Sequence, residues 1–232
     1  MFFKVKIKQF KVCLLLMLHV VFSSASEATT NTPIPEDFKT ASMICSDVKG
    51  MDYRRNDREA NILRGKVEGA HFTEGVQRGL YGNTGALEGD LNYTLSKFPN
   101  HPKALLVTAQ NQMRPGYSSQ RKLRKDKSWP SKECYFKRAL DLAPDDPQVH
   151  LVIAIFYHQY KNVKVAQRHY EKAIKINSQN PEAHYNYGLL LLTVGEIDKA
   201  KEHAKIAYGL GYPLQGLKNK LISANVWTAK NN

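Results

Sequence analysis

The sequence predicts an all-α fold in which helices pair into hairpins, and three observations carry this prediction. First, the segments 147–180 and 181–214 align when the sequence is shifted by 34 residues. Second, small residues recur inside both segments, as closely packed helix pairs require. Third, no stretch alternates apolar and polar residues over a convincing strand length. Stacked helical hairpins account for all three observations.

The first 25 residues have the composition of a secretory signal peptide. Four lysines open the chain, an apolar run broken only by His19 extends from Val12 to Phe22, and Ser23 and Ala25 supply the small residues of a cleavage site. This run is shorter than the ~20 residues that span a bilayer as a helix, which favours a cleaved signal over a membrane anchor. We therefore expect residues 1–25 to be a signal peptide and the protein to be exported, with the bacterial periplasm as its compartment.

Export changes the interpretation of the cysteines. Cys45 and Cys134 are the two that remain after the signal, and an oxidising compartment would allow them to form a disulfide. The sequence gives no distance between the two residues, so it leaves open whether the bond forms.

Residues 26–84 are predicted to be a polar spacer followed by a glycine-rich leader. The spacer is small, polar and proline-bearing up to about residue 40, residues 41–64 have apolar positions for one short helix, and seven of the chain's 14 glycines lie between Gly65 and Gly89. Glycine at this density disfavours long regular helices. We therefore expect the helical domain to cover residues 85–222, with a tail at 223–232.

Within that domain, the spacing of apolar residues predicts three helices ahead of the repeats and one after them. The three begin near residues 87, 102 and 135, and prolines end the first and the third. The closing helix follows Pro213 and is recognised by three apolar residues: Leu217, Leu221 and Ile222.

The two repeated segments resemble the tetratricopeptide repeat family. The first segment has small or aromatic residues at five positions of the family pattern, namely Ala154, Tyr157, Ala166, Tyr170 and Ala173. The second segment keeps the small residues Gly188, Ala200 and Ala207. Both depart from the pattern where His150 and His184 replace the favoured tryptophan. The resemblance implies a helical-hairpin solenoid of about three repeats with capping helices, and an insertion of eleven residues between the helices of the first repeat.

In that family, the first helices of successive repeats line a groove that binds peptides. The matching positions of this chain are mostly apolar, and the candidate groove residues are Leu151, Val152, Ile155, His158, Tyr185, Asn186 and Leu189. The resemblance thus implies an adaptor or scaffold that binds a protein or peptide through apolar anchors. The same residues would also suit packing against a neighbouring helix, and the sequence does not decide between the two.

The inserted segment is the second candidate site. The chain has 34 Lys+Arg against 21 Asp+Glu, a formal net charge of +13, and seven basic residues against one acidic residue lie between positions 114 and 132. The densest part of this cluster consists of Arg121, Lys122, Arg124 and Lys125. Such a cluster suits an anionic partner, for example membrane headgroups or an acidic polysaccharide. A solvated loop is the simpler interpretation of the same charges.

No enzyme, cofactor or metal site is predicted. The histidines lack the spacing of helical metal ligands, and the glycine-rich stretch lacks the Lys-Ser/Thr ending of a phosphate-binding loop. His71 lies near Glu68 and Glu74 in the sequence, and we expect this grouping to stabilise a turn. Nucleic acid is not an expected partner, because export argues against it and the basic cluster lacks regularly interleaved aromatic residues.

Overall fold

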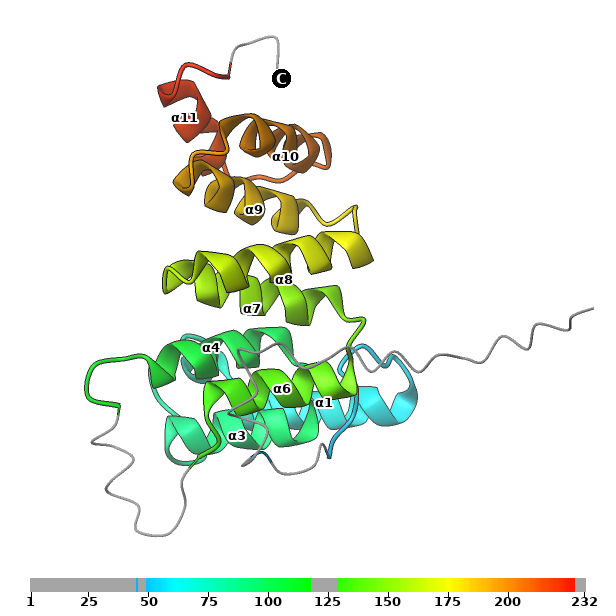
Figure 1. Ribbon diagram of the computed structural model, residues 1–232. Helices are drawn as coiled ribbons and strands as arrows, with labels where there is room; N and C mark the ends of the chain where they lie inside the picture. Colours follow the sequence, from blue (N-terminus) through cyan, green and yellow to red (C-terminus); the bar gives the residue numbers. More distant parts are fainter. Residues whose placement is uncertain (1–44, 46–48, 118–128, 228–232) are drawn as a thin grey trace, which may run out of the picture. The chain divides into compact units, whose positions relative to one another are not determined.

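The computed structural model describes Cys45, residues 49–117 and residues 129–227, and the regular structure in these ranges is entirely α-helical (Figure 1). This confirms the expected all-α fold. The expected signal peptide lies outside the described residues. The helices are α1 (Arg58–His71), α2 (Glu74–Gln77), α3 (Leu87–Lys97), α4 (Pro102–Gln112), α6 (Lys132–Leu142), α7 (Pro147–Gln159), α8 (Val163–Ile176), α9 (Pro181–Thr193), α10 (Ile197–Gly209) and α11 (Gly216–Ser223).

The repeated segments form the two most extensively packed helix pairs. Helix α7 pairs with α8 and α9 pairs with α10, and a turn of three residues joins the helices of each pair. Helix α8 also packs on α9, and α7 packs on α4 and α6 (Figure 1). The hairpins predicted from the 34-residue period are therefore present and stacked on one another.

A polar cap followed by proline starts the first helix of each of these hairpins. Pro147 and Pro181 occupy the first turns of α7 and α9, where a missing backbone N–H costs nothing. Asp146 accepts a hydrogen bond from the Gln148 N–H at 2.9 Å, and Asn180 accepts one from the Ala183 N–H at 3.1 Å. These caps satisfy helix donors that would otherwise lack partners, which fixes where α7 and α9 begin.

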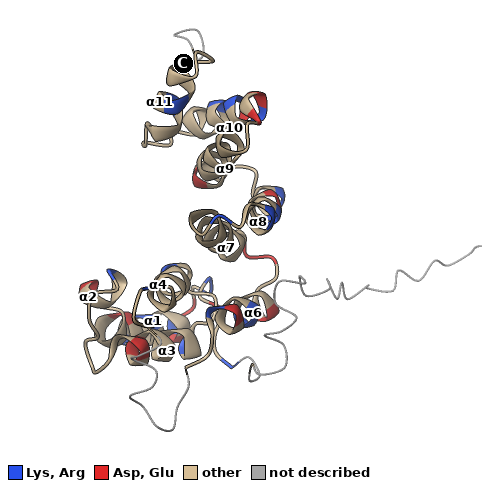
Figure 2. Ribbon diagram, turned by 60° about the vertical axis from the view of Figure 1, so that its left-hand side comes forward, with Lys and Arg blue, Asp and Glu red and all other residues tan. Residues whose placement is uncertain are grey.

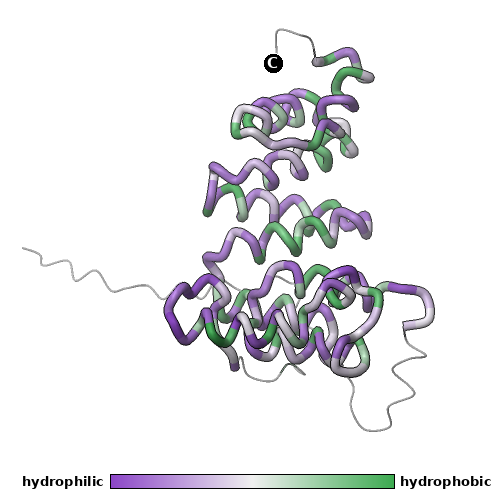
Figure 3. Tube along the Cα trace, turned by 180° about the vertical axis from the view of Figure 1, so that it is seen from behind, coloured by the Kyte–Doolittle hydropathy of each residue, from purple (hydrophilic) through white to green (hydrophobic). Residues whose placement is uncertain are grey.

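The buried apolar residues form two clusters, and α7 contributes to both. Val149 and Ile153 face the cluster shared with α3, α4 and α6, whereas Ala154 faces the cluster shared with α8, α9, α10 and α11. The small residues of the family pattern, including Ala166 and Ala173, are fully buried between helices. Hydrophobic and hydrophilic residues alternate along the helices accordingly (Figure 3), as expected for helices that bury one face.

Gly188 provides a test of this close packing. A Cβ atom at Gly188 would lie 2.6 Å from Cδ2 of Leu217 in α11. Gly188→Val is therefore expected to lower the free energy of unfolding by about 1–3 kcal/mol through overpacking. Gly209→Val is the matched control, because a Cβ at Gly209 has nothing within 4 Å. Denaturant unfolding of both variants measures the difference, and equal losses would show that Gly188 is not needed for packing.

The glycine-rich leader is more regular than the sequence predicts. Helix α1 runs through Gly65 and Gly69 and packs on α3, and Phe72 and Val76 belong to the first buried cluster. The expectation of no long helix here was wrong because both glycines lie on the exposed side of α1, with nothing near their missing Cβ atoms. Each then costs only about 1 kcal/mol of helix propensity, which packing offsets. The helical region begins at Arg58 rather than at residue 85.

The segment before α1 is held by one buried amide. The side chain of Asn100, which is fully buried, accepts a hydrogen bond from the Tyr53 N–H at 2.8 Å. It donates to Asp52 at 2.7 Å and to Asp146 at 2.9 Å. Because Asn100 precedes α4 and Asp146 caps α7, this network ties residues 52–53 to two helix starts.

A disulfide joins the same N-terminal part of the chain to α6. Cys45 and Cys134 are bonded, with Cα atoms 5.4 Å apart and a separation of 89 positions in the sequence. The sequence alone had left this pairing open.

Part of the expected C-terminal tail, residues 223–232, is buried against the helices. In α11, Leu217 and Leu221 are fully buried as expected, while Ile222 is exposed. Beyond α11, Trp227 is 5% exposed and packs against Tyr208 with ring centroids 5.9 Å apart. The packed region therefore extends to Trp227, past the expected boundary at residue 222.

Candidate functional site: the first-helix face

Three of the expected groove residues are not available to a partner. Leu151 is 1% exposed, Val152 is 6% exposed and Tyr185 is 7% exposed. Leu151 and Val152 lie in the two buried clusters on opposite sides of α7. Tyr185 is covered by Tyr212, with ring centroids 4.4 Å apart. Their assignment to the groove is corrected: these side chains pack between elements of the chain.

Four of the expected residues keep part of their surface in solvent. Ile155 and His158 on α7, and Asn186 and Leu189 on α9, are partly exposed. Because α7 and α9 are the first helices of adjacent hairpins, these side chains form the accessible part of the expected groove. We refer to Ile155, His158, Asn186 and Leu189 as the first-helix face.

The two polar side chains of this face, His158 and Asn186, lie within hydrogen-bond distance of other groups of the protein. His158 Nδ1 lies 3.2 Å from the hydroxyl of Tyr170, which is fully buried in α8. The amide of Asn186 donates to the backbone oxygen of Glu182 at 3.0 Å. Burial lowers the pKa of His158, which keeps its imidazole neutral at physiological pH. The face is therefore apolar and uncharged at these four positions, which suits apolar anchors of a partner better than charged ones.

Glu182 lies one turn from Asn186 at the start of α9. Its pKa is raised by burial. A repeat-position argument includes this residue among groove positions, but only the folded chain shows that its carboxyl is partly desolvated.

The basic cluster Arg121, Lys122, Arg124 and Lys125 lies outside the described residues. The adjoining described residues are engaged: the Arg114 guanidinium donates to the backbone oxygen of Gly79, and Lys132 pairs with Glu133 at 2.6 Å.

Two buried histidine pairs occupy equivalent places in the two repeats. His150 Nδ1 and His169 Nδ1 are 3.0 Å apart, and His184 Nδ1 and His203 Nδ1 are 2.8 Å apart. In each pair the first histidine also places Nε2 near a backbone oxygen, of Pro144 at 3.2 Å or of Ser178 at 3.1 Å. Since a carbonyl only accepts, Nε2 carries the proton, Nδ1 accepts, and the second histidine donates from its own Nδ1.

This hydrogen-bond arrangement requires the first histidine of each pair to be neutral, because its Nδ1 accepts. Burial lowers the pKa of His169 to about 3 and that of His203 to about 4, and it also lowers the pKa values of His150 and His184. The pairs thus replace the family's tryptophan with a polar link between the two helices of a hairpin.

His71 has a structural partner other than those suggested by the sequence. Its Nδ1 lies 2.8 Å from Asp90, whose carboxylate also accepts from the Thr84 hydroxyl and from the backbone N–H groups of Asn83 and Thr84. Burial alone would raise the pKa of Asp90, but the hydrogen bonds from Thr84 and His71 outweigh it and lower that pKa. The cluster holds the 82–85 loop against α1 and α3.

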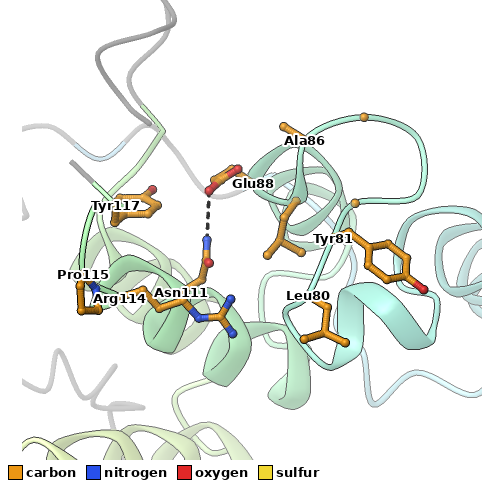
Figure 4. Close-up of a pocket in the computed structure, with 11 residues that line it drawn as sticks. Leu80, Tyr81, Ala86, Glu88, Asn111, Arg114, Pro115 and Tyr117 are labelled. Carbon is orange, nitrogen blue, oxygen red and sulfur yellow. Dashed lines mark hydrogen bonds between the residues drawn. The ribbon is translucent and has the colours of Figure 1, made fainter. Parts of the chain in front are cut away.

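A cavity of about 350 Å³ lies between this loop and the end of α4 (Figure 4). Its wall includes the exposed Leu80 and Tyr81 on one side and Arg114 on the other. Three polar wall residues have hydrogen-bond partners: Glu88 accepts from Asn111 at 3.1 Å, and Arg114 donates to the backbone oxygen of Gly79 outside the wall. The cavity nevertheless presents more polar than apolar surface.

Neither a metal-ligand group nor a helix suited to a bilayer is present in the described ranges. Within them, no three His, Cys, Asp or Glu side chains are grouped so that they could hold a metal ion. None of the described helices is both long enough and apolar enough to cross a membrane.

Comparison with known proteins supports the repeat. Residues 169–202 match the model of the tetratricopeptide repeat, over one 34-residue period that begins within α8 and ends within α10. The resemblance seen in the sequence is thereby confirmed over this segment. No curated protein matches the chain.

Two solved structures are similar to the chain. One is described as the crystal structure of MamA, with a TM-score of 0.44 and 15% identity, covering 74% of this chain and 87% of that one. The other is described as a MamA RS-1 ArsTM double mutant, with a TM-score of 0.41 and 16% identity, covering 68% of this chain and 76% of that one.

Proposed function

We propose that this chain, a protein built with tetratricopeptide repeats, is a scaffold that binds a peptide or protein segment on its first-helix face. The observation that carries the proposal is the partial exposure of Ile155 and Leu189 on adjacent first helices, most of whose other apolar side chains are buried. Apolar residues left in solvent beside neutral polar groups suit a partner with apolar anchors and few charges. No catalytic role is assigned to the chain.

We also propose that the protein acts after export, in the bacterial periplasm. The signal-like composition of residues 1–25 supports this, and so does the Cys45–Cys134 disulfide, because disulfides persist in oxidising compartments. N-terminal sequencing of the protein from its own cells tests it: a start near Ser26 is expected, and a start at Met1 would contradict export by this signal.

A photo-crosslinking amino acid placed at position 189 tests the binding proposal. The same group at Ile206, which is 41% exposed on the second helix α10, is the matched control. In extracts of the cells that make the protein, position 189 is expected to capture one dominant partner that position 206 does not. Capture should persist at roughly 0.5 M salt, because apolar contacts are little screened. Equal capture at both positions, or loss of capture in salt, would contradict the proposal.

A further inference from the structure

A row of basic side chains runs along the exposed side of α8. It consists of Lys161 in the turn before the helix and Lys164, Arg168, Lys172 and Lys175 within it. Residues three and four apart share a helix face, so these charges project side by side over about 20 Å. Figure 2 shows the basic residues on α8, on the opposite side of the hairpin from the first helix α7. We call these five residues the α8 row.

The four lysines of the α8 row lack the acidic partners that most lysines of the neighbouring second helices have. In the described part of the chain, Lys161, Lys164, Lys172 and Lys175 form no salt bridge. On α6, by contrast, Lys137 pairs with Asp141 at 2.5 Å. On α10, Lys199 pairs with Glu196 at 3.1 Å and Lys205 pairs with Glu202 at 2.8 Å. The four lysines of the α8 row therefore concentrate positive charge that no salt bridge compensates in the described part of the chain.

One acidic residue, Glu171, lies on the flank of the row. It accepts hydrogen bonds from the Tyr187 hydroxyl at 2.7 Å and from Gln167 at 2.9 Å. The Tyr187 bond links its carboxylate to α9, and one acidic residue is outnumbered by the five basic residues of the row.

Comparison with the equivalent helix of the next repeat, α10, shows whether folding requires these basic residues. Shifted by 34 residues, Lys164 and Arg168 correspond to Asp198 and Glu202 on α10, and Lys172 corresponds to Ile206. Both helices form the same hairpin with their partners. Folding therefore does not require basic residues at these positions, and their presence on α8 calls for another explanation.

Lys161 adds a second, independent observation. Its backbone has φ of 61°, in the left-handed region, and the equivalent residue of the next repeat is Gly195 with φ of 82°. A lysine in this conformation costs roughly 1 kcal/mol relative to glycine. The chain keeps a lysine at the end of the row where glycine would be easier to accommodate, and such local strain is found at functional positions.

We propose that the α8 row binds an acidic polypeptide segment, on a surface separate from the first-helix face. The row is one helix wide, and α10 presents Asp198 and Glu202 at the matching positions. A flat anionic bilayer would meet those acids, and the row lacks the large apolar side chains that insert into membranes. A run of Asp and Glu matches it better, because carboxylates on one helix face repeat at the same spacing as the row.

The test exchanges residues between the two repeats. Lys164→Asp/Arg168→Glu gives α8 the residues that α10 already tolerates, so the hairpin should still fold. Lys199→Asp/Lys205→Glu on α10 changes the net charge by the same amount and is the matched control. Binding of a fluorescent polyglutamate of about 20 residues to the mature protein is measured by anisotropy at about 50 mM salt. Circular dichroism checks the fold of each variant.

The exchange on α8 is expected to weaken polyglutamate binding about tenfold or more, since two ion pairs are lost and two repulsions are added, whereas the control should change it less than about threefold. Equal weakening by both variants would show that only net charge matters and would overturn the proposal. Unchanged binding in the α8 variant would assign the interaction to other basic residues and would also overturn it. Tighter binding to phosphatidylglycerol vesicles than to polyglutamate would replace the acidic segment with a membrane.

Discussion

Replacing Cys45 with serine is expected to lower the free energy of unfolding by about 2–5 kcal/mol, the usual cost of losing a native disulfide. The bond joins residues separated by 89 positions, so it restricts a large part of the unfolded chain. The helices should remain, because Asn100 still ties residues 52–53 to α4 and α7 through its own hydrogen bonds. Denaturant unfolding of the oxidised protein and of the variant measures the loss.

A reducing agent provides the control for this prediction. It should destabilise the unsubstituted protein by the same amount as the substitution and should leave Cys45→Ser unchanged. Cys134 is 5% exposed, so its thiol in the variant is accommodated without new contact with solvent. If the variant is as stable as the oxidised protein, the disulfide does not support the fold.

Lowering the pH from 7 to 5 is expected to destabilise the protein by several kcal/mol. The folded pKa values of His169, about 3, and of His203, about 4, lie below the unfolded value near 6.5. Between these values only the unfolded chain takes up protons, so stability falls as the pH falls below about 6.5. At pH 5 the cost is about 2 kcal/mol for each histidine that stays neutral in the fold.

The surroundings of the two pairs differ in charge. Lys172 and Arg168 lie near the first pair and further oppose its protonation, whereas Asp146 favours it. Glu171 and Glu202 lie near His203 and favour its protonation. Of the two pairs, His184–His203 should therefore take up a proton at the higher pH.

Removal of one pair tests the cause of this pH dependence. His184→Leu/His203→Leu replaces both partners with apolar groups, so neither imidazole is left without the other. The loss of stability between pH 7 and 5 is expected to shrink by about 2–4 kcal/mol relative to the unsubstituted protein. His150→Leu/His169→Leu is the matched variant in the other repeat. An unchanged pH dependence in both variants would exclude the pairs as its source.

The second half of the fold could be predicted from the sequence because its signals are local. Pro147 and Pro181 mark the starts of α7 and α9, and the 34-residue period fixes the turns between helices. The buried alanines, such as Ala166 and Ala200, follow from the same spacing.

The first half was predicted less well because packing overrides composition there. Gly65 and Gly69 signal a break in regular structure, yet tertiary contacts of Val67 and Phe72 hold α1 together. A single sequence gives each glycine's propensity but not whether its side of the helix faces solvent. The hydrogen bonds of Asn100 join residues nearly 50 positions apart and leave no local pattern.

The sequence places the candidate groove on the first helices, but three of the residues that it assigns to the groove are buried. Repeat positions assign Leu151, Val152 and Tyr185 to the groove, but in this chain these side chains fill gaps between helices. For Tyr185 the cause is Tyr212, which follows α10 and packs against its ring. A single sequence does not distinguish an apolar residue that a partner covers from one that a neighbouring helix covers.

Hydrogen exchange of the mature protein, alone and with the partner captured through position 189, tests the central claim most directly. If the partner binds on the first-helix face, peptides covering α7 and α9 should exchange more slowly in the complex, by at least about tenfold at Ile155 and Leu189. Peptides covering α10 should exchange as before. Protection confined to the second helices α8 and α10, or to residues 49–117, would contradict the claim that this protein binds its partner on the first-helix face.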